Sequence, residues 1–335
     1  MADQHGSGCK GIANHMIEAR KNLWLLGTGP HARAYVKVLS EMATEYEVIG
    51  RSEISASEFS TLTGKNVLSR DLTQSLKRIG APDYAIVSVS FDQLAQVSIE
   101  LIHAGVKNLL IEKPGGLNLQ EITAIHSAAS IHKTKVYIGY NRRFYEAAIY
   151  ARRQIAAEGG ALSCHFEFTE WASTIEDWNV SLDIKNHLLI ANSSHVIDLA
   201  FFLCGKPKNM QSYHSGEISW HTRSARFAGS GETETGALFS YIADWQAPGR
   251  WGVEVMTREN RYIFRPMEQL HKVKLGSVTL ESVTLDDAMD REFKPGLFRQ
   301  TQAFLKDEIA NICSLEEQVR MITIYSKMAG YSNSL

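Results

Sequence analysis

The sequence predicts an α/β protein: an N-terminal Rossmann domain with a doubly wound parallel sheet, followed by an α+β domain with a large open, mainly antiparallel sheet. Two observations predict this fold class. Up to about residue 140, short apolar runs alternate with segments of helical period, which is typical of β-α-β units joined by right-handed crossovers. From about 208 to 284, strand-like runs follow one another directly, as in an antiparallel sheet.

A chain of 335 residues is long enough for two domains. The change of pattern near residues 140–145 locates the boundary between them. We predict an N-terminal extension at 1–21, a Rossmann dinucleotide-binding domain at 22–143, and an α+β substrate-binding and oligomerisation domain at 144–335.

Each element of the first half has a local reason. NLWLLG and YAIVSVS are aliphatic or β-branched, as strands covered on both faces are. Pro30 suits the first turn of a helix, and Gly64 and Gly105 stand where two further helices end. The predicted strands are 22–27, 46–50, 84–90, 107–112 and 135–140, and the predicted helices are 30–43, 55–64, 91–105 and 117–132.

The second half mixes helices with strands of alternating polarity. We predict helices at 145–160 and 193–205, a strand at 161–171, and two closing helices at about 297–311 and 315–330. One face of the intervening antiparallel sheet must be covered by substrate, helices or another subunit.

Composition excludes several classes of function. With 35 basic and 37 acidic residues the net charge is −2, which argues against nucleic acid or an anionic membrane as a partner. No apolar run approaches the roughly 18 residues of a membrane span, and residues 1–22 lack the apolar core of a secretory signal. The four dispersed cysteines (Cys9, Cys164, Cys204, Cys313) predict reduced thiols in a cytoplasmic protein, and no metal site is expected.

A G-x-G-x-x-A motif opens the first predicted helix. Gly27 allows a tight strand-to-helix turn, Gly29 lets the backbone approach a pyrophosphate, and Ala32 allows close packing of helix and strand. The motif follows a strand and begins a β-α-β unit, which is the context that makes it specific. We therefore predict dinucleotide binding, with Thr28, Pro30 and His31 completing the cofactor-binding turn.

The end of the second strand indicates which dinucleotide is bound. NAD sites usually place a carboxylate there, whereas this chain has Gly50, Arg51 and Ser52. A guanidinium and a hydroxyl suit a 2′-phosphate, so NADP is favoured over NAD. The alternative is that Arg51 is a solvated loop charge and that Glu53 reaches the ribose.

IEKPGG, at residues 111–116, closes another apolar run. Pro114 cannot donate to a sheet ladder, so the strand should end there and leave Lys113 at its carboxyl edge, where open α/β sheets bind ligands. A lysine partly desolvated in such a cleft has a lowered pKa and can act as an acid or base. Glu112 would fix the loop or orient Lys113. The alternative is that Lys113 is a solvated charge at a strand end.

EKPGG, GYNRRF (139–144) and SSHVIDLAFFL (193–203), behind the Rossmann motif, resemble the Gfo/Idh/MocA oxidoreductases over about residues 22–331. The resemblance implies hydride transfer between NAD(P) and a secondary hydroxyl or keto group of a sugar, inositol or nucleotide sugar. It also implies that Lys113 binds the reacting hydroxyl, that the Lys113–Pro114 bond is often cis, and that His195 is an acid/base. A homodimer or homotetramer assembled through the C-terminal sheet is expected on the same ground.

The chain also departs from these relatives. Many carry an aspartate four residues before the histidine, where this chain has Ala191. Four nearby polar residues could substitute for it: Asn192, Asp183, Lys185 and His187. The alternative is a dinucleotide-binding sensor or regulatory protein with lost or weak catalysis.

The remaining candidates border the same predicted cleft. Ser88 and Ser90 follow the fourth Rossmann strand and, with Asn141, are expected to contact the cofactor. The expected substrate contacts are Tyr140, Arg142, Asn192 and Asp198. Arg143 is expected to be solvated or paired. The aromatic residues Trp171, Trp178, Tyr241 and Trp245 either stack on a sugar or belong to the sheet core or a subunit interface.

Overall fold

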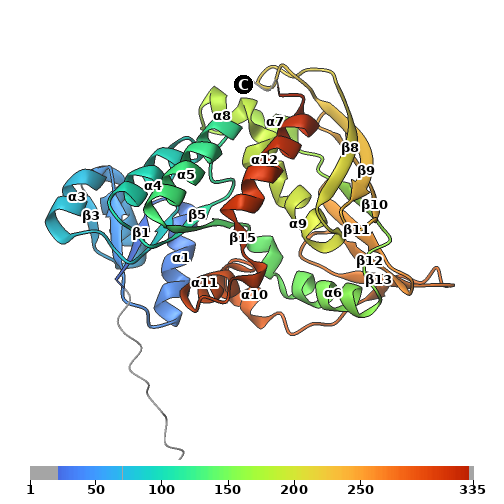
Figure 1. The fold of residues 1–335 in the computed structure, drawn as a ribbon, viewed down its shortest axis with the longest axis horizontal. Helices are drawn as coiled ribbons and strands as arrows, with labels where there is room; N and C mark the ends of the chain where they lie inside the picture. Colours follow the sequence, from blue (N-terminus) through green and yellow to red (C-terminus); the bar gives the residue numbers. More distant parts are fainter. Residues whose placement is uncertain (1–21, 70, 332–335) are drawn as a thin grey trace, which may run out of the picture.

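The computed structural model describes residues 22–69 and 71–331, and the predicted extension at 1–21 lies outside this range. Its elements form two sheets that lie next to each other (Figure 1). The first has seven strands in the order β15-β6-β5-β4-β1-β2-β3. Its strands are β1 (Leu23–Leu26), β2 (Glu47–Gly50), β3 (Val67–Ser69), β4 (Tyr84–Val87), β5 (Asn108–Glu112), β6 (Lys135–Gly139) and β15 (Cys313–Ser314).

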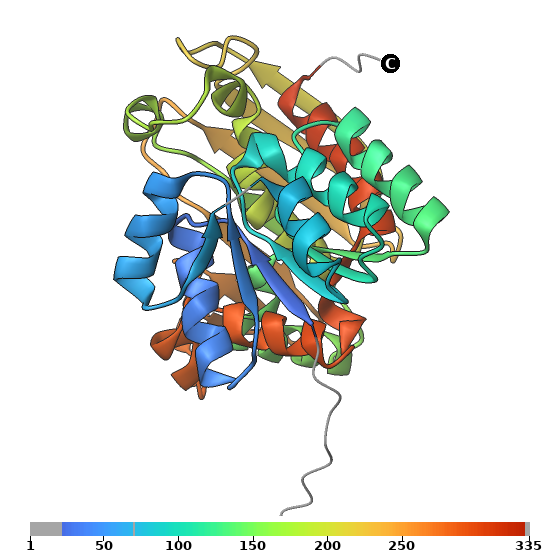
Figure 2. The same ribbon diagram turned by 90° about the vertical axis from the view of Figure 1, so that its left-hand side faces the viewer.

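Strands β1 to β6 are parallel, which confirms the doubly wound Rossmann sheet. Alternate residues of β1 point to opposite faces, so Leu25 packs in one hydrophobic cluster and Trp24 in another. Helices cover both faces (Figure 2). They are α1 (Pro30–Glu41), α2 (Glu53–Thr63), α3 (Leu72–Ile79), α4 (Leu94–His103), which follows the short helix η1 (Phe91–Gln93), and α5 (Leu119–His132).

The second sheet has eight strands in the order β14-β13-β12-β11-β7-β10-β9-β8 and is antiparallel except between β7 and β10. This confirms the predicted mainly antiparallel sheet. Its strands are β7 (Ser163–Glu167), β8 (Pro207–Ser215), β9 (Arg226–Thr233), β10 (Leu238–Asp244), β11 (Gly252–Met256), β12 (Asn260–Phe264), β13 (His271–Lys274) and β14 (Glu281–Ser282).

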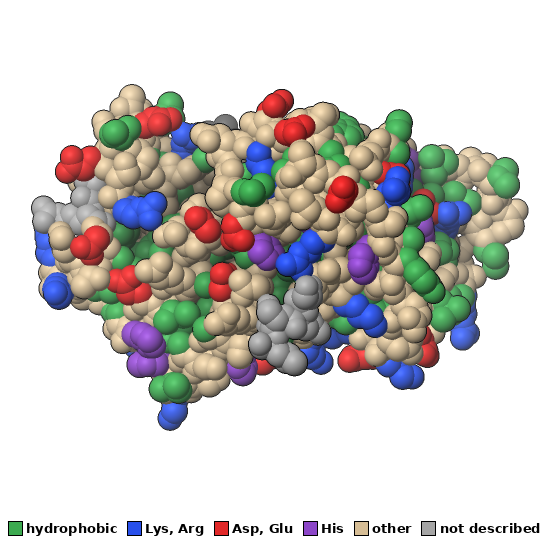
Figure 3. Space-filling view, turned by 90° about the horizontal axis from the view of Figure 1, so that it is seen from above, with side chains coloured by type: hydrophobic (Ala, Val, Ile, Leu, Met, Phe, Trp, Pro, Cys, Tyr) green, Lys and Arg blue, Asp and Glu red, His purple; other side chains and the backbone are tan. Residues whose placement is uncertain are grey.

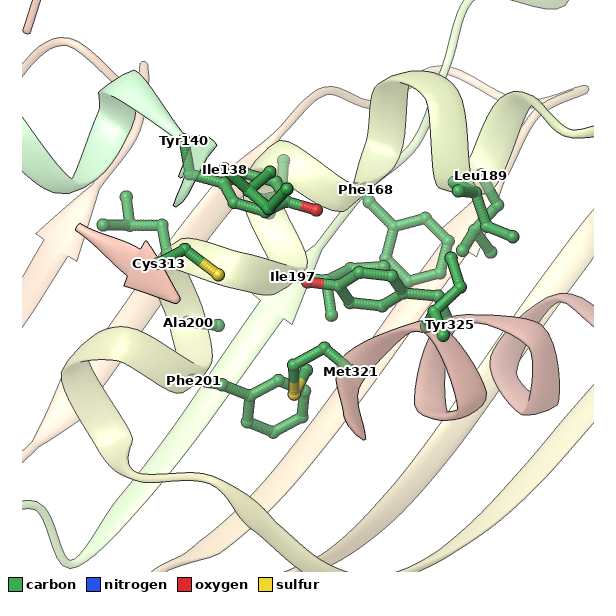
Figure 4. Close-up of a cluster of buried hydrophobic side chains, with 14 of the residues drawn as sticks. Ile138, Tyr140, Phe168, Leu189, Ile197, Ala200, Phe201, Cys313, Met321 and Tyr325 are labelled. Carbon is green, nitrogen blue, oxygen red and sulfur yellow. The ribbon is translucent and has the colours of Figure 1, made fainter. Parts of the chain in front are cut away.

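The space between the sheets is filled by α9 (Ser194–Cys204) and α12 (Leu315–Ala329), which both pack on one face of the second sheet. Figure 4 shows Phe201 of α9 and Tyr325 of α12 in one hydrophobic cluster with Ile138 and Cys313 of the first sheet. Helix α6 (Glu146–Ala157) packs against α9. This shared core fixes the position of α9, which begins with predicted site residues.

The chain returns to the first sheet near its C-terminal end. The predicted helix at 297–311 is wrong in its length, because α11 (Leu297–Leu305) ends early, packs on α1, and is followed by η4 (Ile309–Asn311) and β15. Strand β15 then pairs antiparallel with β6. The domain boundary at residues 143/144 remains a prediction.

Several short elements have too few residues to show a sequence period. These are η2 (Asn141–Phe144), α7 (Ala172–Glu176), α8 (Leu182–Asn186), the π-helical turn η3 (Leu189–Ser193) and α10 (Ala288–Glu292). Within the part of the chain that the structure describes, no helix combines the length and the apolar character of a bilayer span. On the face that Figure 3 shows, basic and acidic side chains are interspersed.

Candidate active site

A cleft of about 850 Å³ opens at the carboxyl ends of β1, β2, β4 and β5, where the strand order reverses between β1 and β4. Parallel strands end at the same edge of a sheet, so residues far apart in the sequence meet here. The predicted residues that line it are Gly27, Thr28, Gly29, Pro30, His31, Arg51, Ser52, Ser88, Ser90, Glu112, Lys113, Asn192 and His195.

The glycine-rich turn has the shape that a diphosphate needs. Gly27 has a φ of +116°, and a Cβ there would lie 2.1 Å from the carbonyl oxygen of Ser88. At Gly29, which is the N-cap of α1, a Cβ would meet no described heavy atom beyond its chain neighbours within 4 Å. The N-terminus of α1 therefore lies at the wall of the cleft, where the turn leaves room for a diphosphate. Ala32 lies behind the turn, fully buried.

A cation lines the cleft at the end of β2. Arg51 Nη1 donates to Gln93 Oε1 at 3.1 Å, and Ser52 is the N-cap of α2. Glu53, which is the first residue of α2, lies outside the lining of the cleft. Arg51, Ser52 and Gln93 thus line this part of the cleft together with Asp71.

Lys113 lies at the end of β5 and is 7% exposed. Its Nζ donates to the carbonyl oxygen of Ala191 at 2.6 Å and lies 4.8 Å from the ring centre of Phe91. The Lys113–Pro114 bond is cis. Burial lowers the pKa of Lys113 to about 7, helped by Arg142 and opposed by Glu112. The amine is thus close to half protonated at neutral pH and can accept or release a proton.

His195 lies in the first turn of α9 and lines the cleft. Its ring centre is 6.3 Å from that of Tyr140 and 6.2 Å from that of Trp251. Burial, followed by the charge of Lys113, holds the pKa of His195 well below its ordinary value, so the imidazole is neutral. Its Nδ1 has no hydrogen-bond partner among the described residues. A neutral imidazole with a free nitrogen can bind a hydroxyl group.

Glu112 is held by two residues of α1. Tyr35 Oη donates to Glu112 Oε1 at 2.6 Å, and His31 Nε2 lies 2.8 Å from the same oxygen. His31 Nδ1 lies 2.5 Å from Lys294 Nζ, and Lys294 also lines the cleft. Burial opposes ionisation, but His31 and Tyr35 hold the pKa of Glu112 below its ordinary value. Lys294 comes from the segment before α11, and no motif in the sequence indicates it.

No protein-family model and no curated protein matches the chain. Solved structures do. The UDP-N-acetylglucosamine 3-dehydrogenase GnnA from Acidithiobacillus ferrooxidans matches with a TM-score of 0.73 at 17% identity, over 94% of this chain and 98% of that one. Levoglucosan dehydrogenase with NADH matches with a TM-score of 0.76 at 17% identity, over 93% and 96%. The WlbA dehydrogenase from Chromobacterium violaceum, with NADH and UDP-GlcNAcA, gives 0.71 at 16% identity, over 94% of each chain.

The chain has the fold of the Gfo/Idh/MocA oxidoreductases. The expected resemblance is thereby confirmed for the arrangement of the two sheets. At identities of 16–17% the comparisons show the fold alone, and the roles of single residues rest on the geometry described above.

Within this fold, four predicted contacts besides Ala32 lie outside the lining of the cleft. Tyr140 is 1% exposed and packs on His195, and Asn141 Nδ2 donates to the carbonyl oxygen of Pro295 at 2.8 Å. The guanidinium of Arg142 lies 4.8 Å from the ring centre of Trp251. The fourth is Asp198, described next. Tyr140 thus packs on the ring of His195, and Arg142 packs on Trp251, which lies against the same ring.

Asp198 and Arg143 form a buried pair. Arg143 Nη2 and Nε donate to the two carboxylate oxygens of Asp198 at 2.6 and 2.9 Å, and Nη2 also donates to Glu317 at 2.9 Å. Arg143 is thus paired. Asp198 therefore joins η2, α9 and α12 and does not face the cleft.

Of the four residues that could substitute for the missing aspartate, one lines the cleft and three lie outside its lining. Asn192 lines the cleft. His187, the C-cap of α8, has its Nδ1 3.3 Å from Asp183 Oδ1, and Lys185 of α8 donates to the carbonyl oxygen of Glu176. The aromatic candidates also divide: Trp245 and Tyr241 are 2% exposed core residues, Trp178 packs on the same core, and Trp171 is 54% exposed.

Proposed function

We propose that the chain is an NAD(P)-dependent oxidoreductase. It would transfer a hydride between a nicotinamide dinucleotide and a secondary hydroxyl or keto group of a sugar, inositol or nucleotide sugar. The observation that carries this proposal is that one cleft joins the glycine-rich turn to Lys113 and His195. GnnA, levoglucosan dehydrogenase and WlbA, whose fold is shared, are dehydrogenases of sugars or nucleotide sugars by their names.

The residues divide the work by position. A bound nicotinamide supplies the hydride acceptor or donor. Gly27, Gly29 and the N-terminus of α1 hold the diphosphate. Lys113 binds the reacting hydroxyl group and takes its proton on Nζ, because the neutral amine is available near pH 7. His195, which is neutral, hydrogen-bonds the same hydroxyl and orients it.

We infer a preference for NADP, because Arg51 and Ser52 line the cleft at the end of β2 and Glu53 does not. The levoglucosan dehydrogenase and WlbA structures contain NADH, so the preference needs its own test. Titration with NADPH and NADH, followed by tryptophan fluorescence, should give at least about tenfold tighter binding of NADPH.

The variant Arg51→Gln should lose most of that preference, because the guanidinium that pairs with the 2′-phosphate is gone. Arg78→Gln, at an exposed arginine in the last turn of α3, is the matched control and should bind as the wild type does. Tighter binding of NADH by the wild type would overturn the NADP assignment. Binding of neither dinucleotide would overturn the proposed function.

We further propose a homodimer or homotetramer assembled through the second sheet in a cytoplasmic protein. Helices α9 and α12 cover one face of this sheet, whereas Leu238, Ile242 and Tyr213 are more than half exposed on its strands. Apolar side chains gathered on a sheet face mark an interaction surface. Among the described cysteines, Cys164, Cys204 and Cys313 are free and buried, which agrees with a reducing compartment.

The regulatory alternative has no observation in its favour among the described residues. Substitution of Lys113 separates the two readings, because an enzyme loses turnover and keeps cofactor affinity. A sensor with Lys113 substituted would keep the binding of its partner.

A further inference from the structure

A buried carboxylate that sequence motifs do not indicate lies behind the cleft. Glu170, which follows β7, is 2% exposed. Its Oε1 accepts hydrogen bonds from Asn192 Nδ2 at 3.0 Å and from Ser193 Oγ at 2.8 Å. Its Oε2 lies 3.5 Å from Arg250 Nη1. A carboxylate is costly to bury, and this one is satisfied on both oxygens by named donors.

The two donors, Asn192 and Ser193, lie on the turn that contacts Lys113 and leads into the helix that carries His195. This turn is η3, in which the carbonyl oxygen of Ala191 accepts from Lys113 Nζ and the next two residues donate to Glu170. Helix α9, with His195 in its first turn, begins directly afterwards. Glu170 therefore ties down the segment on which the positions of both Lys113 and His195 depend.

Glu170 also bears on the charge of Lys113. The charged groups that act on Lys113 are Glu112, Arg142, Lys294 and Glu170. Glu112 has the largest effect of the four and Glu170 the smallest, and Glu170 lies on the η3 side of the amine. Burial raises the pKa of Glu170 to about 7, so its charge changes near neutral pH.

We propose that Glu170 is a positioning residue of the active site, which holds the Ala191–Ser193 turn in place and adds to the counter-charge that Glu112 supplies to Lys113. This inference rests on the proposed function for its catalytic meaning. Its test needs neither cofactor nor substrate, so the two can fail separately.

The apparent pKa of Lys113 is measured on the whole chain by trace labelling with acetic anhydride over a range of pH, with the labelled peptides read by mass spectrometry. Glu170→Gln should lower this pKa, because a carboxylate nearby stabilises the ammonium form. Glu170→Asp, which keeps the charge, should remain nearer the wild-type value. Glu232→Gln, which removes a carboxylate of β9 that pairs with Lys208, should change nothing.

The effect of Glu170 on the Ala191–Ser193 turn is measured separately. Asn192→Ala removes one hydrogen bond to Glu170 from a half-buried side chain, so this variant tests the proposal even if Glu170→Gln does not fold. Hydrogen exchange of the amides at 189–195 should become faster in Asn192→Ala. An unchanged Lys113 pKa in folded Glu170→Gln, or unchanged exchange in Asn192→Ala, would overturn the proposal.

Discussion

The buried pair of Arg143 and Asp198 gives a prediction whose magnitude follows from the structure. Arg143→Met keeps the length of the side chain and removes the guanidinium that serves both Asp198 and Glu317. The side chains of Arg143 and Asp198 are 4% and 1% exposed, so water cannot replace the lost partner of Asp198. The carboxylate must then either stay charged without a partner or bind a proton.

Protonation limits the cost. Burial raises the pKa of Asp198 from 3.8 to about 6 even though Arg143 opposes the shift. Each unit by which folding shifts this pKa corresponds to about 1.4 kcal/mol of unfolding free energy. If Asp198 of the variant is still fully protonated at pH 8, this effect makes the variant less stable than the wild type by at most roughly 2.7 kcal/mol. The lost hydrogen bonds and contacts add about 1–2 kcal/mol, for a total of roughly 3–5 kcal/mol.

The sign of the pH dependence is fixed. An acid whose folded pKa lies above its unfolded value loses stability as the pH rises between the two values, and the variant has the higher folded pKa. At pH 5 Asp198 is mostly protonated in both proteins, so the difference should fall to about 1–2 kcal/mol. Urea unfolding at the two pH values measures this.

Arg153→Met is the control, because Arg153 is 67% exposed and lies 3.7 Å from Glu146. It should change the free energy of unfolding by less than about 1 kcal/mol at either pH. The reasoning is refuted if Arg143→Met costs less than about 1 kcal/mol at pH 8, or equal amounts at both pH values.

Three further predictions concern the site and the surface. Gly27→Ala should abolish dinucleotide binding, measured by tryptophan fluorescence, because its Cβ would lie 2.1 Å from the Ser88 carbonyl oxygen in a turn with φ of +116°; wild-type affinity would contradict this. Lys113→Met should lower turnover by about 100-fold or more and keep the affinity for the dinucleotide. The oxidation rate of the wild type should rise with pH through about 7, because the amine of Lys113 loses its proton there. A pH-independent rate would contradict the role of the amine. Ile242→Lys should lower the mass measured by light scattering, whereas Ile54→Lys, at an 84% exposed residue of α2, should not; equal masses for both variants and the wild type would exclude this sheet face as the interface.

The sequence alone determined the features that repeat locally. The alternation of apolar runs with helical periods predicted the parallel first sheet, and the alternating runs of the second half predicted the mainly antiparallel sheet. The glycine-rich turn and the end of β5 were predicted as parts of one cleft, because parallel strands end at the same edge. Strand β3, helix α3 and the early end of α11 were not predicted, since short or polar segments carry little periodic signal.

The tertiary structure alone decided which distant residues meet. Lys294, from the segment before α11, lies against His31, and Glu170, which follows β7, accepts hydrogen bonds from the two residues after Ala191. Asp198, which was predicted as a substrate contact, is paired with Arg143 in the core. Spacing along a chain sets only the neighbours within one helix or strand, whereas contacts between elements depend on how two sheets and their helices pack, and that is fixed only when the whole core is formed.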